Sequence, residues 1–246
     1  MRDIPIIFSA PMVRALLGGR KTMTRRLAWR EVIMLPGEGA PTPTPWQKVK
    51  PGDRLWVREN HRFHGRSYEE PEEIEWYRCY SEAGAPDCWD PRFPRGWHPT
   101  EHQGQHQMTD SGEHEEGTVP YATKLLPSIH MPRWASRLTL VVTATKIERL
   151  QDISGPDSIA EGVECPTCTA MGKSACNRLG CFASQGAFAE LWSRLHGRES
   201  WDANPEVVAI TFAVHRCNID NLPPQPASSP QAAAPGGDPT LPPGKP

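Results

Sequence analysis

A short basic segment near the N-terminus holds the side chains best suited to chemistry. Residues 18–26 read Gly-Gly-Arg-Lys-Thr-Met-Thr-Arg-Arg, and residues 14–30 contain six basic side chains and no acidic one. Because the whole chain has a formal charge of −2, this positive charge is a local concentration. Guanidinium groups and hydroxyls gathered at one turn suit a phosphate, a nucleotide base or another planar polar ligand. The alternative is a solvated helix C-terminus, where the helix dipole favours cations.

Cysteines form the second chemically informative group. The chain has seven of them, and this odd number argues against a complete disulfide framework. Four follow the pattern C-x2-C-x7-C-x4-C, namely Cys165, Cys168, Cys176 and Cys181. Four thiolates at this spacing can complete a tetrahedral structural zinc site, and the alternative is a set of free thiols. We therefore expect zinc as a structural cofactor and no organic cofactor.

The elements that position these groups can be predicted from periodicity and from start and stop signals. Ser9, followed two residues later by proline, is typical of a helix start, and the glycine pair at 18–19 ends that helix just before Lys21. Ser154 is expected to cap a second helix, which contains Glu161. The other predicted elements are strands at 54–59, 74–80, 138–145 and 206–214 and a helix at 186–196.

Strands outnumber helices in this pattern, and the helices are short. This favours an α+β fold, a small mixed β-barrel with short helices packed at its ends, over a doubly wound parallel sheet. We expect one domain over residues 1–221, with irregular insertions at 83–120 and 164–184. Nine of the 25 residues at 222–246 are proline, so this segment is predicted to be a disordered tail.

The sequence shows neither the pattern of a secretory signal nor an apolar run of membrane-spanning length. We therefore expect a cytoplasmic protein without a membrane partner.

Five segments of the chain resemble a known family. Residues 19–26 are similar to the G-x-K-x-x-T/E-x-R signature of ASCH domains, which belong to the PUA-like superfamily. Residues 52–59 resemble the second strand of that family, and residues 153–162 resemble its helix before the last strands. Residues 128–137 and 201–205 are similar to segments of the ASCH-like proteins that tailed phages and prophages encode. The resemblance covers roughly residues 4–216.

The resemblance implies a PUA-like barrel with a cleft beside the signature that binds RNA, a nucleoside or a modified base, in the cytoplasm of a bacterial host. Some small bacterial members are amidohydrolases that deacetylate N4-acetylcytidine with a Lys, a Thr and a Glu. Lys21 and Thr24 fall on the first two positions, and Glu161, or else Glu164, falls on the third. The residues expected to contact a ligand are Arg20, Arg25, Arg26, Arg133 and Trp134.

Two functions therefore follow from the sequence. One is a cleft protein that binds RNA or a nucleobase. The other is an amidohydrolase in which Thr24 attacks an N4-acyl carbonyl, Lys21 serves as base and Glu161 passes the proton to the leaving amine.

Overall fold

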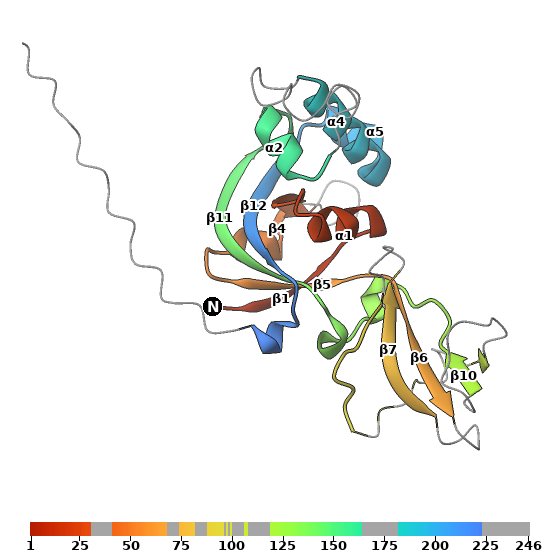
Figure 1. The fold of residues 1–246 in the computed structure, drawn as a ribbon. Coiled ribbons are helices and arrows are strands. Elements are labelled where there is room, and N and C mark those ends of the chain that lie inside the picture. Colours follow the sequence, from red (N-terminus) through yellow and green to blue (C-terminus); the bar gives the residue numbers. More distant parts are fainter. Residues whose placement is uncertain are drawn as a thin grey trace, which may run out of the picture.

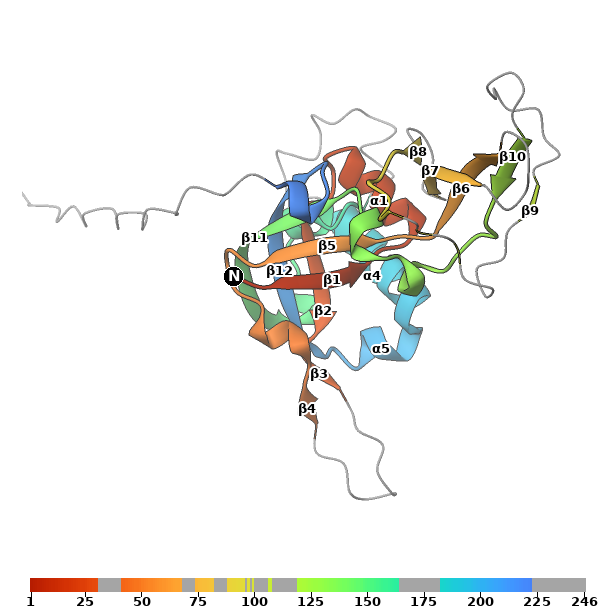
Figure 2. The same cartoon turned by 90° about the horizontal axis from the view of Figure 1, so that it is seen from below.

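The structure, a computed structural model, describes residues 1–30, 41–67, 74–81, 88–95, 97, 99, 106–107, 119–163 and 182–222. This part of the chain forms two five-stranded sheets with short helices, and the second sheet lies to one side of the first in both views (Figures 1 and 2). The predicted α+β class is confirmed. The cysteine cluster, Glu164 and the tail beyond residue 222 lie outside the described residues.

The first sheet carries the basic segment. Its strands, in spatial order, are β1 (Asp3–Ile7), β5 (Arg54–Arg58), β11 (Thr139–Arg149), β12 (Glu206–His215) and β2 (Met23–Leu27). β1 pairs with β5 in parallel, and the other neighbours are antiparallel. β1 and β2 are its edges, so across the described residues this sheet is open and does not close into the expected barrel.

The core of the first sheet follows from the alternation of apolar residues along its strands. Side chains two positions apart share one face, and helix α1 (Ala10–Leu17) packs against that face through Val13 and Leu16 (Figure 1). The strand residues buried there include Ile6, Leu55, Val57, Leu140, Val142, Val208, Ile210 and Phe212. The register of β11 against β12 shifts between Val142 and Ala144, beyond which β11 continues toward the helices.

Three helices cover one end of the long β11–β12 pair (Figure 1). They are α2 (Gly155–Ala160), α4 (Phe182–His196) and α5 (Arg198–Asp202). As predicted, Ser154 caps α2, and its hydroxyl accepts a hydrogen bond from the Asp157 amide. Phe188 and Trp192 of α4 pack on Ile153 in a small separate core. Helix α4 begins four residues earlier than the apolar pattern suggested.

The second sheet comes from the middle of the chain, which includes the insertion expected at 83–120. Its strands, in spatial order, are β8 (Cys88–Trp89), β7 (Glu75–Ser81), β6 (His61–Ser67), β10 (Val119–Ala122) and β9 (His106–Gln107). β8 and β9 lie within the insertion, where the sequence shows little periodicity, and β10 begins at its end. The second sheet has a separate hydrophobic core, which includes Phe63, Trp76 and Met131.

The remaining described elements are short connections. They are strands β3 (Trp29–Arg30) and β4 (Thr42–Pro43), and the 3-10 turns Pro45–Lys48, Ser128–His130, Arg133–Ala135, Leu150–Asp152 and Ile219–Asn221.

We expect the fold to lose stability in mild acid because of His61, which lies in the second sheet. Its side chain is fully buried, and burial lowers its pKa from 6.5 to about 4. Because the folded pKa lies below the unfolded one, the unfolded chain binds the proton first as the pH falls. The free energy of unfolding should therefore drop by about 3 kcal/mol between pH 6.5 and pH 4 on account of this group. Urea denaturation of wild type and His61→Gln across this range measures the difference.

The matched control is His215→Gln, which changes a partly exposed histidine of the first sheet. This variant should keep the wild-type acid dependence, whereas His61→Gln should flatten it. Equal pH slopes for wild type and His61→Gln would show that folding does not lower the pKa of His61.

Candidate functional site

The site is built on an ion pair between residues 140 positions apart. Lys21 follows the glycine turn that ends α1, and Glu161 is the C-terminal cap of α2. The Lys21 Nζ donates to Glu161 Oε2 and to the Glu161 carbonyl oxygen, both at 2.8 Å. The two residues also form a backbone bridge, and the Thr22 amide donates to the Ala160 carbonyl at 2.8 Å. The structure thus brings the basic segment at 18–26 next to residues 160–162.

Both members of this pair are taken out of water. Lys21 is 2% exposed and Glu161 is 4% exposed. Burial lowers the pKa of Lys21, and the nearby charges of Arg26 and Arg25 add to this, while the attraction of Glu161 opposes it. A buried charge pair is costly to desolvate and is kept only with good geometry, and perturbed ionisable groups in a cleft mark candidate functional sites.

A pocket of about 280 Å³ opens over the pair. Lys21, Thr24 and Glu161 all line it, so the three residues expected to act together share one cavity. Its other lining residues are Ile7, Phe8, Ser9, Met12, Arg25, Arg26, Phe188, Leu191, Trp192, Leu195 and His196. The pocket therefore combines a small charged floor with mainly apolar and aromatic walls, which is the usual make-up of a small-molecule site.

Arg26 belongs to the rim of this pocket. Its Nη2 donates to the Ile7 carbonyl at 2.8 Å, and its guanidinium lies over the rings of Phe8 and Trp46, at 5.3 and 5.5 Å from their centroids. Its Nε is buried and has no hydrogen-bond partner among the described residues. Buried donors without a partner are uncommon in folded proteins, so this one is a candidate contact for an acceptor on a ligand.

Arg25 is more deeply buried than a residue that contacts a ligand would be. We expected it to contact a ligand, and it does line the pocket, but its side chain is 0% exposed. Its guanidinium donates hydrogen bonds to the carboxylates of Glu148, Asp157 and Glu161. The physical reason is that three acidic groups from β11 and the α2 region meet behind β2, and a buried arginine neutralises them.

Three other expected ligand contacts do not join the pocket. Arg20 is exposed at the end of the glycine turn. Arg133 pairs with Asp220 and with Asp3, at 2.6 and 2.7 Å. Trp134 packs in the aromatic core of the second sheet, stacked on Phe63 with ring centroids 5.5 Å apart.

Helix α4 is the part of the site that sequence reasoning missed. The helical spacing of Phe188, Leu191, Trp192 and Leu195 supports the helix predicted at 186–196, but no ligand-binding role was assigned to that face. In the structure the same face also forms a pocket wall, with His196 at its end. The signal was therefore present, but apolar periodicity cannot distinguish a core from a cavity wall.

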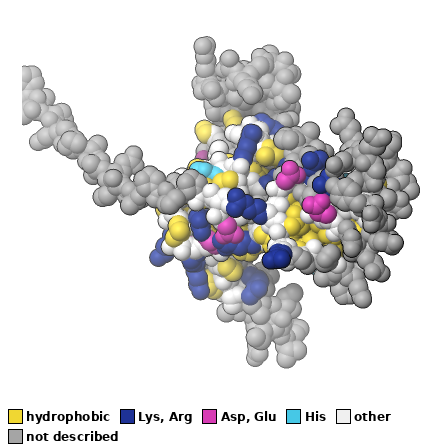
Figure 3. Space-filling model, turned by 60° about the horizontal axis from the view of Figure 1, so that its bottom comes forward, with side chains coloured by type: hydrophobic (Ala, Val, Ile, Leu, Met, Phe, Trp, Pro, Cys, Tyr) yellow, Lys and Arg dark blue, Asp and Glu magenta, His cyan; other side chains and the backbone are white. Residues whose placement is uncertain are grey.

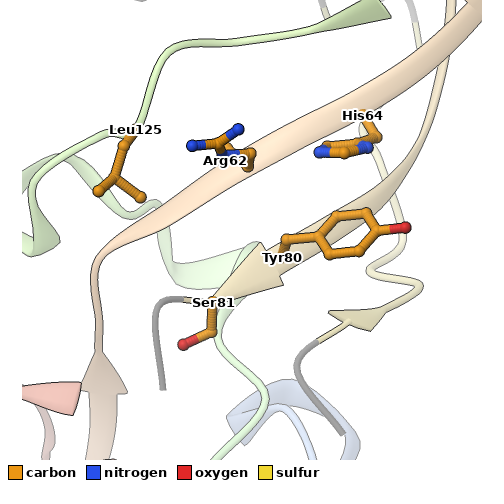
Figure 4. Close-up of a pocket in the computed structure, with 5 residues that line it drawn as sticks. All are labelled: Arg62, His64, Tyr80, Ser81 and Leu125. Carbon is orange, nitrogen blue, oxygen red and sulfur yellow. The ribbon is translucent and has the colours of Figure 1, made fainter. Parts of the chain in front are cut away.

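A second cavity, of about 290 Å³, lies on the other sheet (Figure 4). Arg62, His64, Tyr80, Ser81 and Leu125 line it, and the His64 and Tyr80 rings stand 3.9 Å apart, centroid to centroid. A third, of about 570 Å³, is lined by Trp134, Arg137 and other residues near the end of β12. Neither has a buried acid–base pair like that of Lys21 and Glu161 among its lining residues.

The described residues contain neither a group arranged to hold a metal ion nor a membrane-spanning helix. No group of three or more His, Cys, Asp or Glu side chains there is arranged to hold a metal ion. No helix in the same part of the chain is long and apolar enough to span a bilayer.

Comparison with known proteins adds nothing to the description of this site. No family model, no curated protein and no solved structure matches this chain.

Proposed function

We propose that this chain is an ASCH-type protein with a PUA-like sheet that binds a nucleobase or nucleoside in the pocket over Lys21. The observation that carries the proposal is the buried pair of Lys21 and Glu161 at the floor of a cavity with aromatic walls. The sequence resemblance supports the same assignment, because four residues of the basic segment, Lys21, Thr24, Arg25 and Arg26, line the cavity.

The unused hydrogen-bonding capacity of the pocket suits one edge of a base. Two of the three N–H donors of Lys21 point to Glu161, which leaves one for a ligand acceptor. Arg26 Nε offers a second donor, and the Glu161 carboxylate retains acceptor sites. A cytosine ring presents carbonyl and ring-nitrogen acceptors beside an exocyclic amine, so it complements two donors beside an acceptor.

The size of the pocket favours a small ligand. Ligand cavities commonly enclose roughly 300–1,000 Å³, and this one, at about 280 Å³, lies at the lower end. It accommodates a single base or nucleoside, and an RNA would have to insert one unstacked base. On the face drawn in Figure 3, lysine and arginine side chains are interspersed with acidic ones, which is less favourable to a long polyanion than a continuous basic stripe.

Titration with cytidine and with N4-acetylcytidine tests this proposal. We expect saturable binding with chemical-shift changes in Thr24, Phe188 and Trp192, which line the pocket. Arg26→Gln should weaken binding of the nucleoside about tenfold, since it removes the rim donor. The matched control is Arg194→Gln, an exposed arginine of α4. Saturable binding that leaves the pocket signals unmoved would contradict the assignment.

Hydrolysis of an N4-acyl group is the second candidate. The observation that favours it is a threonine hydroxyl in the same cavity as a lysine whose pKa is lowered by burial. Lys21 first passes a proton to Glu161 and becomes a neutral amine. Thr24 Oγ1 then bonds to the acyl carbon and gives its proton to Lys21, while protonated Glu161 supplies the proton with which the cytosine amine leaves. Water hydrolyses the acyl-threonine and restores the resting groups.

Ultraviolet absorbance separates the two functions. A hydrolase converts N4-acetylcytidine to cytidine and acetate with turnover, and Thr24→Val abolishes that conversion. A binding protein returns the acetylated nucleoside unchanged.

We also propose that the four clustered cysteines bind one structural zinc ion. The segment that contains them joins Glu161 to α4, and both of these line the pocket. Metal analysis should therefore find about one zinc per chain, and Cys168→Ser should reduce it. Removal of the metal is also expected to weaken nucleoside binding. Cys217→Ser, which changes a cysteine outside the cluster, is the control. Stoichiometric free thiols in a metal-free native protein would contradict the zinc site.

A further inference from the structure

We propose that Arg25 is a positioning residue, which holds Glu161 in the orientation that pairs with Lys21 without itself needing to contact the ligand. This inference rests on the proposed function for its ligand, but its geometry stands on the protein alone. The sequence resemblance assigns Arg25 only to ligand contact.

Arg25 uses all of its side-chain hydrogen-bond donors inside the protein. A guanidinium has five N–H donors in a fixed fork, and five contacts are seen. Nε and Nη2 donate to Glu148 Oε1 at 3.0 and 2.7 Å, and Nη2 also donates to Asp157 Oδ2 at 3.1 Å. Nη1 donates to Glu161 Oε1 at 3.2 Å and approaches Met23 Sδ at 3.3 Å. No donor is left over for a ligand.

The two oxygens of the Glu161 carboxylate have different partners. Oε1 accepts from Arg25, and Oε2 accepts from Lys21. Arg25 thus holds one oxygen of Glu161, and the other oxygen pairs with Lys21 in the pocket. Without the Arg25 contact the carboxylate could rotate about its last side-chain bond, which is a soft torsion.

Arg25 is itself held by carboxylates that do not line the pocket. Glu148 lies on β11 and Asp157 on α2, and Lys146 pairs with both of these carboxylates at 2.9 and 3.0 Å. Lys146 is half exposed, with 51% of its side chain accessible. The charges therefore alternate in sign from Lys21 at the pocket floor to Lys146 at the surface, and they join β2, β11 and α2.

The test uses Arg25→Lys, which keeps the charge but loses the planar fork. NMR of isotope-labelled lysine side chains reports the Lys21 ammonium directly. In the wild type, its protons should exchange slowly with water. In Arg25→Lys, we expect exchange about tenfold faster, together with about tenfold weaker binding of N4-acetylcytidine. Arg54→Lys is the matched control, because Arg54 makes a similar two-point pair with Asp3, at 2.7 Å for each contact, away from the pocket.

A second variant tests the same role if Arg25→Lys does not fold. Glu148→Gln keeps Arg25 and removes one charge that holds it, so it should shift Lys21 exchange in the same direction. Wild-type Lys21 exchange in folded Arg25→Lys and in Glu148→Gln would overturn the positioning role. Faster exchange in these variants, with no nucleoside binding by wild type, would leave the positioning role intact and reject only the proposed ligand.

Discussion

Replacing Lys21 with methionine is expected to abolish nucleoside binding and any turnover, and to destabilise the fold. The substitution leaves the Glu161 carboxylate, 4% exposed, without its closest cationic partner. Breaking a buried ion pair by removing one member typically costs about 3–5 kcal/mol, because the other charge stays buried. Urea denaturation gives the loss in the free energy of unfolding, and nucleoside titration at low temperature gives the loss of binding in the folded fraction.

Two further variants separate stability from function. Lys21→Met combined with Glu161→Gln removes both charges, so it should recover much of the stability but none of the binding. Lys146→Met changes a half-exposed lysine that also pairs with carboxylates, and it should cost about 1 kcal/mol or less. Normal binding in a folded Lys21→Met protein would remove Lys21 from the site.

The second large effect is expected from Gly162→Ala, directly after the site glutamate. Gly162 has φ +85°, in the left-handed region, and a Cβ there would stand 3.0 Å from both the Ala15 Cβ and the Lys21 Cβ. The backbone conformation costs about 1–2 kcal/mol for alanine, and relief of the close contacts adds about 1–3 kcal/mol. The methyl group would also push Lys21 away from Glu161. Thermal unfolding and nucleoside titration measure the two effects.

The matched control for this prediction is Gly52→Ala. Gly52 has nearly the same φ, +88°, but a Cβ there meets nothing within 4 Å. The difference between the two variants therefore isolates the contact with Ala15 and Lys21 from the backbone cost. Equal losses of stability, with binding unchanged in both, would show that the α1 and α2 ends are not closely packed.

The sequence by itself determined most of the local elements around the site. The glycine pair ends α1 where predicted, because a glycine turn supplies the backbone angle that other residues avoid; Gly19 has φ +68°. Ser154 caps α2 because its hydroxyl satisfies a free amide of the first turn. Three strands of the first sheet, β5, β11 and β12, were predicted from the sequence pattern, whereas β1 was not. The order of the five family-like segments pointed to Lys21, Thr24 and Glu161.

The tertiary structure alone decided which of these groups meet. Apolar periodicity reports which face of an element is buried but not which distant element buries it. The sequence therefore could not place Trp134 in the second core, nor show that the apolar face of α4 lines a cavity. The same holds for charge. Arg25 and Arg26 are adjacent and chemically identical, yet strand alternation and the carboxylates of β11 and α2 bury the Arg25 side chain completely while Arg26 stays at the rim. Whether an arginine serves a ligand or the fold depends on acidic groups more than a hundred residues away.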